Sequence, residues 1–328
     1  MRRFTCRCGQ ALFFDNHRCE RCGRQLGFEP GRLELLAEPE PGDGLPFCRN
    51  RDSAIRCNWL ADGPDPACLS CRSSKVIPSL SKPQNRERWR KLEVAKRRLV
   101  YDLLRLGLPV DPTRLRFMFK EDRRTNPNVH EEHVSIGHAR GVITINAAEA
   151  DEVYREQMRQ QMFEPYRTLL GHFRHESGHY YFDVIVDDET RRDAARRVFG
   201  EQTGYDEALA RYYRDGPAPD WPARYISSYA SAHPAEDWAE TWAHYLHIRA
   251  ALETASANGL LRPDLRQGGW CDGFAELAVG LNELMRSLGL PDAYPFILNA
   301  AVAEKLDFIH EAVQAYVSRP DAHAPAAV

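Results

Sequence analysis

The chain has 328 residues, of which 43% are hydrophobic and 28% are charged, and its formal net charge is −3. This composition is typical of a globular protein and excludes a chain that is disordered throughout. No apolar run approaches the roughly 20 residues of a membrane-spanning helix, and the N-terminus lacks the apolar stretch of a secretory signal. We therefore expect a cytoplasmic protein with no membrane contact, built as two domains or as one large domain with a small appendage.

Eight of the nine cysteines lie before residue 72 and form two quartets, each ending in a C-x2-C pair. Two thiolates at that spacing can bind one tetrahedral ion from a tight turn. Four disulfides are the alternative, but the short pairs and the missing signal favour two structural zinc ions. A cross-braced arrangement would use the same eight residues as sequential quartets. The quartets are Cys6, Cys8, Cys19 and Cys22, then Cys48, Cys57, Cys68 and Cys71.

These cysteines predict a small zinc-ribbon-like module over residues 1–75. The segment is too short and too polar to fold by burial alone, so zinc would supply the missing folding energy. Its aromatic residues Phe4, Phe13, Phe14 and Trp59 are expected to form a small core. The alternative is that these rings form a stacking surface for nucleic-acid bases.

Residues 76–84 are typical of a linker, and residues 85–107 then show apolar side chains at helical spacing. Residues 76–106 carry nine Lys or Arg against three Asp or Glu, whereas residues 107–328 have a net charge of −11. A protein or nucleic-acid partner could therefore bind through residues 1–106. A solvated basic helix face is the simpler interpretation.

The remainder of the chain is mainly helical with a short sheet. Residues 115–120 and 141–146 are typical of strands, with a third near 134–138. Residues 318–328 are expected to be a disordered tail. The fold class is therefore α+β: a small cysteine-rich module precedes a mainly helical domain over residues 85–317. Apolar periodicity predicts helices over 148–163, 165–182, 188–199, 205–214, 234–256, 273–287 and 297–317.

The segment His175-Glu176-Ser177-Gly178-His179 matches the pattern H-E-x-x-H. On a helix the two histidines lie one turn apart, so both imidazoles can bind one zinc ion. Glu176 would flank that ion without binding it, which suits a general base acting on a zinc-activated water. Gly178 is expected to leave open space beside the second histidine.

Two histidines leave a catalytic zinc site one protein ligand short. A third histidine in the longer pattern H-E-x-x-H-x-x-G-x-x-H is excluded, because Phe182 and Ile185 occupy the glycine and histidine positions. The third ligand could instead be a carboxylate that lies further along the chain. We assign Glu236 as the third ligand and Glu240, one turn on, as the acceptor of a histidine N–H. The alternative ligands are Glu240, His233, Asp237 and His244.

Tyr229 lies seven residues before Glu236. Its phenol could donate a hydrogen bond to the oxyanion that forms when water attacks a carbonyl. His233 is the alternative donor, and a place in the core is the alternative role for Tyr229. Residues 141–146 could form a sheet-edge strand against which an extended peptide pairs.

HESGH followed by Y-x6-E-x3-E resembles the glutamate-ligand zinc metallopeptidases, the gluzincin type, and SYASAHPAEDWAETWAHYL is similar to their lethal-factor-like branch. With the two cysteine quartets, the chain resembles a bacterial family of zinc-binding metallopeptidases that carry an N-terminal zinc-ribbon-like domain. The resemblance implies a zincin-like domain that hydrolyses peptide bonds in a peptide or protein substrate. It also implies that His175, His179 and Glu236 bind one catalytic zinc and that Glu176 is the base.

Two other functions remain open at this point. One is a nucleic-acid-associated zinc protease that is recruited through the basic N-terminal region. The other is a non-catalytic interaction protein built on its zinc-ribbon-like module. A structural zinc site needs no base at the position of Glu176, which favours the enzyme.

Overall fold

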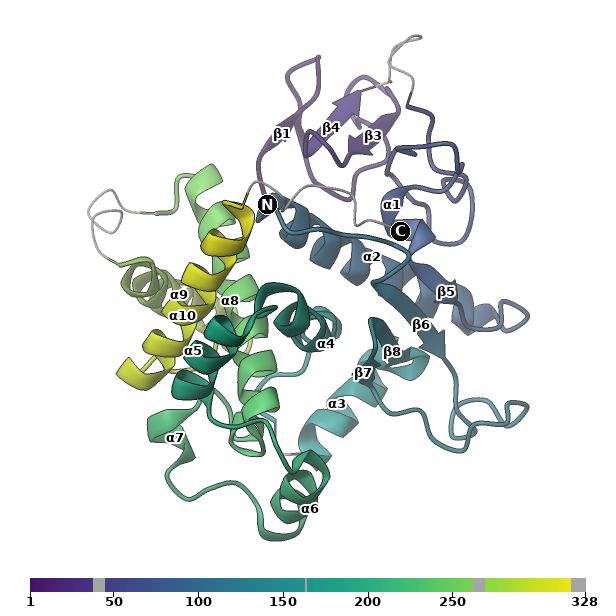
Figure 1. Ribbon diagram of the computed structural model, residues 1–328. Helices are drawn as coiled ribbons and strands as arrows, with labels where there is room; N and C mark the ends of the chain where they lie inside the picture. Colours follow the sequence, from purple (N-terminus) through teal and green to yellow (C-terminus); the bar gives the residue numbers. More distant parts are fainter. Residues whose placement is uncertain (38–44, 163, 262–268, 320–328) are drawn as a thin grey trace. The chain divides into compact units, whose positions relative to one another are not determined.

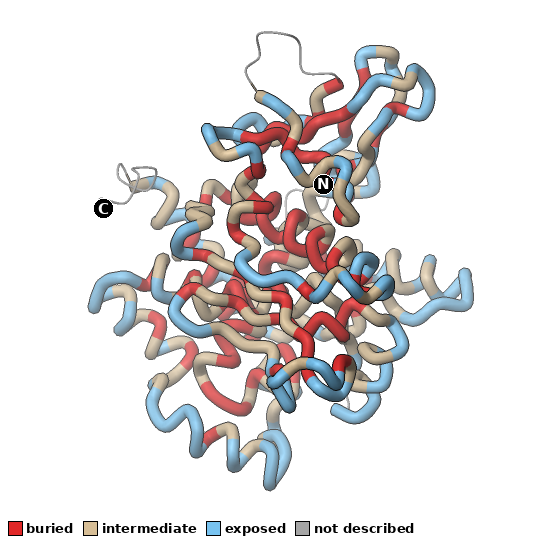
Figure 2. Tube along the Cα trace, turned by 90° about the vertical axis from the view of Figure 1, so that its right-hand side faces the viewer, coloured by how far each residue is buried: buried red, intermediate tan, exposed pale blue. Residues whose placement is uncertain are grey.

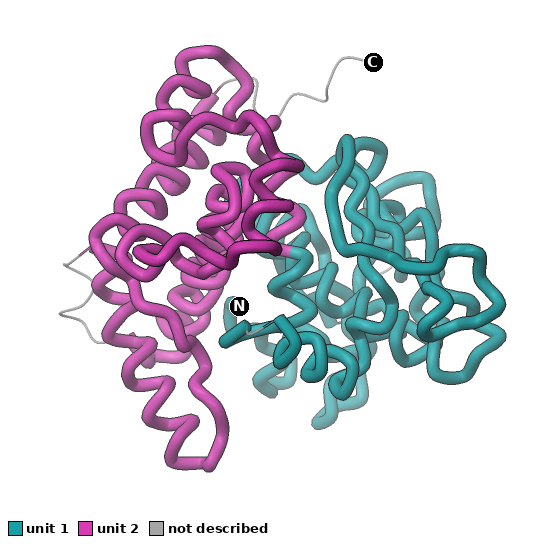
Figure 3. The backbone as a smooth tube through the Cα atoms, turned by 90° about the horizontal axis from the view of Figure 1, so that it is seen from below, with its two compact units in different colours: residues 1–173 teal, residues 174–328 magenta. Residues whose placement is uncertain are grey.

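The computed structural model describes residues 1–37, 45–162, 164–261 and 269–319 (Figure 1). The chain divides into two compact units, residues 1–173 and 174–328 (Figure 3). Each unit has buried residues of its own (Figure 2). The fold is mainly helical with small sheets, as the sequence predicts. The domain limits at residues 75, 85 and 317 stay predictions, and the predicted tail lies outside the described residues from residue 320 onward.

The first unit begins with two short antiparallel hairpins. Strand β1 (Phe4–Thr5) pairs with β2 (Ala11–Leu12), and β3 (Leu26–Glu29) pairs with β4 (Glu34–Ala37). Gly9 and Gly23, which follow Cys8 and Cys22, have φ angles of +83° and +80°. Only glycine adopts such angles readily, and they let the chain turn tightly around the thiols. A one-turn helix, α1 (Leu69–Arg72), carries Cys71.

An aromatic cluster forms the core of this module. Phe14 packs against Phe28 with ring centroids 5.0 Å apart, and Phe28 packs against Trp59 at 4.8 Å. Tyr101 joins them, 5.3 Å from Phe14. The prediction for Phe13 was wrong, because its side chain is 78% exposed. Phe13 begins a turn, with its carbonyl oxygen accepting the Asn16 N–H at 2.9 Å, and only Phe14 of the pair enters the core.

Burial excludes a base-stacking role for three of the four rings, but not for the exposed Phe13. Phe4, Phe14 and Trp59 are buried, so they present no stacking surface.

The helix that supplies Tyr101 is α2 (Pro83–Arg105), and several of its basic side chains have acidic partners in the same unit. Arg88 Nη2 lies 2.5 Å from Asp151 Oδ2, and the buried Lys96 Nζ lies 2.9 Å from Glu93 Oε2. Arg98 pairs with Asp15. These pairs account for part of the basic charge that suggested an acidic partner.

A four-stranded sheet completes the first unit, in the order β5-β6-β8-β7. Strand β6 (Arg116–Lys120) is parallel to both β5 (Ser74–Val76) and β8 (Val142–Asn146), and β7 (Gly137–Ala139) is antiparallel to β8. Strand β8 is therefore internal, and the expectation of an edge strand at residues 141–146 was wrong. The sheet is followed by η1 (Ala147–Ala150) and α3 (Glu152–Gln161).

Helix α4 (Leu169–Ile185) starts in the first unit and ends in the second. The described helices include none that is long and apolar enough to cross a membrane. In the second unit α8 packs against α5, α9, α10 and η2. The elements of this unit after α4 are α5 (Glu189–Phe199), α6 (Tyr205–Asp215), α7 (Trp221–Arg224), η2 (Tyr229–Ser231), α8 (Pro234–Ala257), α9 (Trp270–Ser287) and α10 (Ala300–Val317).

Helices α4 and α8 approach each other closely at Gly178. A Cβ atom on Gly178 would lie 2.9 Å from the Cα of Ala239 and 3.0 Å from Trp242. Trp238 Nε1 donates to the Gly178 carbonyl at 2.9 Å, and Trp242 Nε1 donates to Ser177 Oγ at 3.0 Å. The expected open space at Gly178 is therefore absent, because α8 fills it. This packing holds the first turns of α8 against the H-E-x-x-H segment.

Candidate metal centres

The eight N-terminal cysteines come together as two sequential quartets. The Sγ atoms of Cys6 and Cys22 are 3.6 Å apart, and those of Cys57 and Cys68 are 3.7 Å apart. Sulfur atoms about 2.3 Å from one tetrahedral zinc stand roughly 3.8 Å from one another. Disulfide sulfurs are about 2.05 Å apart. Both quartets therefore fit zinc, and the eight thiols, all within the described part of the chain, form no disulfides.

The second quartet is buried throughout, whereas Cys22 of the first is exposed. Burial lowers the pKa of Arg97, but the charges of Cys57, Glu93, Cys71 and Cys68 raise it overall. Two nitrogens of this guanidinium, Nε and Nη1, have no hydrogen-bond partner among the described residues. A zinc ion with four thiolates carries a formal charge of −2, so Arg97 supplies a buried counter-charge.

A third cluster joins α4 and α8. Nε2 of His175 lies 3.0 Å from Oε2 of Glu236, and Nε2 of His179 lies 3.6 Å from the same oxygen. Glu236 is 1% exposed, and its Oε2 accepts no well-formed hydrogen bond from the described residues. A buried carboxylate oxygen without a partner is costly. A cation between the three atoms would satisfy it, and two imidazoles with one carboxylate are a donor set that suits zinc.

Glu240 orients the first histidine. Its Oε1 lies 2.6 Å from Nδ1 of His175, and its Oε2 accepts a hydrogen bond from Ser227 Oγ at 2.6 Å. Nδ1–H therefore donates to Glu240, which leaves the Nε2 lone pair available to a metal. Burial lowers the pKa of His175, but Glu236 and Glu240 raise it well above its ordinary value, so a metal would displace a proton from Nε2. Burial raises the pKa of Glu236, but the two imidazoles hold it well below its usual range.

Tyr205, the first residue of α6, also belongs to this cluster and has no counterpart in the sequence-based prediction. Its hydroxyl donates to Oε1 of Glu236 at 2.5 Å. Burial and the charge of Glu236 raise the pKa of Tyr205 well above its usual value, so the phenol stays protonated. The only signal for it in the sequence is the preceding glycine. Gly204 caps the start of α6 with a φ of +67°. The partner of Tyr205 lies 31 residues along the chain.

Tyr229 and Glu176 complete the surroundings of the metal ligands. The ring of Tyr229 lies 6.0 Å from that of His175. Burial and the charge of Glu236 raise the pKa of Tyr229, so its hydroxyl is also a donor. Glu176 is buried, and its charge contributes to the raised pKa of Tyr205.

The alternative ligands and donors have other partners. His233 Nδ1 accepts a hydrogen bond from Ala235 N–H, and its Nε2 lies 3.2 Å from the carbonyl oxygen of Thr203. His244 Nδ1 lies 2.8 Å from the hydroxyl of Tyr294. The alternative carboxylate is engaged as well, since Asp237 Oδ2 lies 2.6 Å from Lys305 Nζ.

Comparison with known proteins identifies two family models. One described as "Putative zinc-binding metallo-peptidase" matches residues 85–312, and one described as "zinc-ribbon domain" matches residues 3–82. Uncharacterized proteins of Mycobacterium bovis and Mycobacterium tuberculosis are each 43% identical over 334 residues, covering 95% of this chain and 95% of each relative. No solved structure matches the chain.

Proposed function

Because the chain belongs to the family described as "Putative zinc-binding metallo-peptidase", with a zinc-ribbon domain at its N-terminus, we propose that it is a zinc-dependent peptidase. One observation carries the proposal. The ligand atoms of His175, His179 and Glu236 lie within 4.8 Å of one another, beside the buried Glu176. The two cysteine quartets would hold two further, structural zinc ions.

In this proposal, each residue around the zinc has a separate role in peptide hydrolysis. Zinc, when bound by the three ligands, lowers the pKa of a water molecule and polarises the peptide carbonyl. Glu176 accepts the proton of the attacking water and delivers it to the leaving amine. The protonated phenol of Tyr229 donates to the carbonyl oxygen as negative charge develops there. Glu240 and Ser227 hold the ring of His175 in the orientation that binding requires.

The first test replaces Glu176 with Gln, which keeps the shape of the side chain and removes its basicity. We expect Glu176→Gln to retain zinc and to lose turnover by about a hundredfold or more, the usual contribution of a general base. Zinc-loaded protein is incubated with a peptide library made from a proteome digest, and new termini are identified by mass spectrometry. Zinc content is measured on the same samples.

The matched control is Glu276→Gln, an exposed glutamate on α9, which should cleave like the wild type. Cleavage by Glu176→Gln at the wild-type rate would overturn the mechanism. Absence of any cleavage by the wild-type protein, with all three sites loaded, would favour the non-catalytic interaction protein.

A further inference from the structure

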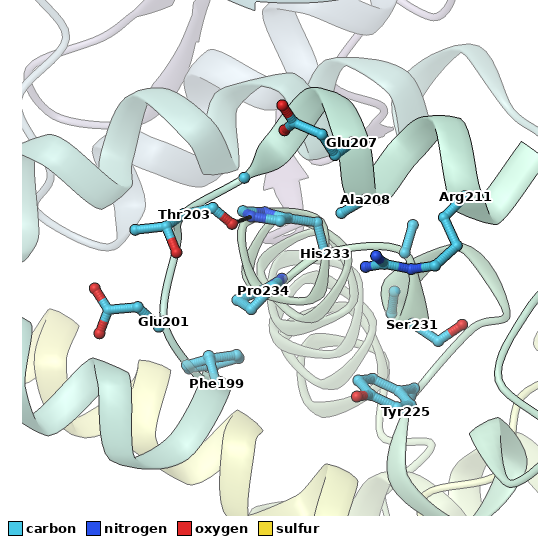
Figure 4. Close-up of a pocket in the computed structure, with 13 residues that line it drawn as sticks. Phe199, Glu201, Thr203, Glu207, Ala208, Arg211, Tyr225, Ser231, His233 and Pro234 are labelled. Atoms are coloured by element: carbon cyan, nitrogen blue, oxygen red, sulfur yellow. Dashed lines mark hydrogen bonds between the residues drawn. The ribbon is translucent and has the colours of Figure 1, made fainter.

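A pocket of about 500 Å³ lies in the second unit, at the start of α8 (Figure 4). Pockets that bind small ligands typically measure roughly 300–1,000 Å³. Its buried wall includes the small side chains of Ala208, Ala230 and Ala232, which leave room for an occupant. The hydroxyl groups of Thr203 and Ser231 and several charged groups surround this wall.

Arg211 is the only Lys or Arg that lines the pocket, whose lining residues all belong to the described part of the chain. Its guanidinium points toward the middle of the pocket, whereas the carboxylates of Glu201 and Glu207 point outward (Figure 4). Glu201 also has a cationic neighbour, since its Oε2 lies 3.8 Å from Nε of Arg196. Arg211 itself has no hydrogen-bond or ion-pair partner among the described residues.

The chemistry of Arg211 selects the occupant. A guanidinium presents its N–H groups as a planar fork that matches the two oxygens of a carboxylate. His233, on the same wall, does not compete for that group, because the Ala235 N–H occupies Nδ1 and the Thr203 carbonyl oxygen lies 3.2 Å from Nε2. Arg211 is therefore the one cationic group of this lining that is available to an anionic occupant.

The pocket adjoins the metal cluster through Tyr205. Gly204 lines the pocket, and the ring of the next residue, Tyr205, packs against His233 with centroids 5.0 Å apart. The hydroxyl of the same tyrosine donates to the metal ligand Glu236. An extended peptide advances about 3.3 Å per residue. A peptide held at the metal would thus bring a nearby residue to the pocket.

We propose that this pocket is a substrate subsite that binds a carboxylate of the peptide, either an acidic side chain or the C-terminus, through Arg211. The inference rests on the proposed peptidase function and names the class of peptide that the site prefers. Its test uses binding, so that it does not depend on turnover.

Zinc-loaded full-length Glu176→Gln protein is titrated into three fluorescent peptide pools with randomised neutral flanks. One pool has a central Glu and an amidated C-terminus, the second has Gln in its place, and the third has the central Gln with a free C-terminus. We expect the Glu pool or the free C-terminus pool to bind roughly tenfold tighter than the neutral pool, the scale of one charge-assisted hydrogen bond. Which of the two binds tighter identifies the source of the carboxylate.

Adding Arg211→Gln to the Glu176→Gln protein should abolish that difference in affinity. The affinity for the neutral pool should not change. The matched control is Arg214→Gln on the same helix, which removes the same charge from an arginine that pairs with Asp215 outside the pocket. Equal binding of all three pools, or a difference that persists in Arg211→Gln, would overturn the subsite. Failure of the proposed function would instead appear as absence of cleavage by the wild-type protein, which is a separate readout.

Discussion

The two oxygens of Glu236 have different partners. Oε2 faces the two imidazoles, and Oε1 accepts the hydroxyl of Tyr205. With Oε1 held by the phenol, the carboxylate presents one oxygen to a metal. Tyr205 would thus be a positioning residue that acts on a bound metal through Glu236.

Replacing Tyr205 with Phe removes this hydrogen bond and leaves the carboxylate free to rotate. We expect zinc affinity at the His/Glu site to fall about tenfold to a hundredfold, the usual loss when a partner of a metal ligand is removed. Competition with a chromophoric chelator measures this affinity. The zinc held by the cysteines is an internal control that should not change. Unchanged affinity at the His/Glu site would show that Glu236 needs no support from the phenol.

Site residues that belong to a local sequence motif were predicted, whereas a residue that joins the site through a contact distant in sequence was not. His175, Glu176 and His179 follow from one five-residue motif, and their helix is present in the structure. Spacing alone placed Glu236 and Glu240 on one face of α8. The structure separates their roles because each faces a different nitrogen of His175. Tyr205 could not be foreseen, since its contact depends on how the loop between α5 and α6 returns to α8.

At the scale of elements, the crossing of α4 and α8 builds the metal cluster. Gly178 lets the backbones meet, and two tryptophans of α8 bond to α4. The H-E-x-x-H segment supplies ligands on one side of α4, and its Ser177 and Gly178 supply the packing surface.

Replacing Gly178 with Ala would place a methyl group against the backbone of Ala239, which cannot move aside as a flexible side chain can. We expect a loss of about 1–3 kcal/mol in the free energy of unfolding, the usual cost of overpacking. Urea denaturation measures it. Gly280→Ala on α9, where nothing lies within 4 Å, is the matched control. It should gain about 0.5–1 kcal/mol from helix propensity. Equal stability of the two variants would contradict the close crossing.

Most helices were predictable from the spacing of apolar side chains together with start signals, such as Pro234 at the first position of α8. Helix α8 was expected at 234–256 and spans Pro234–Ala257, and α5 was expected at 188–199 and spans Glu189–Phe199. Strand β5 was missed because three residues, Ser74–Val76, are too few to show a period. The sheet order was beyond reach as well, because pairing between strands depends on contacts far apart in sequence.

At the scale of the whole molecule, the two cysteine quartets differ in how far solvent reaches their thiols. The first cysteine quartet includes the exposed Cys22, whereas all members of the second are buried. Structural zinc supplies folding energy, so a quartet that loses its zinc also loses stability. Solvent access to the thiols therefore controls how readily each quartet releases its zinc.

A thiol-modifying reagent should therefore release zinc in two steps. We expect the first quartet to react first, and the second to react only after the first unit opens. A zinc indicator follows the release, and mass spectrometry identifies the modified cysteines. Cys271, which belongs to neither quartet, should react without releasing zinc. Release of both ions in a single step would mean that the two quartets unfold together.

The path of α4 limits how this protein can be shortened. The helix runs from Leu169 to Ile185, and the division between the two units falls after Phe173, two residues before the first histidine. The ring of Phe173 belongs with the sheet, 5.7 Å from that of Phe117. A fragment that began at Arg174 would start inside the metal-binding helix, with its first turn missing and the ligand His175 at a fraying end. The smallest piece that keeps this ligand in an intact helix must therefore start before Leu169, and it carries Phe173 without its partner Phe117.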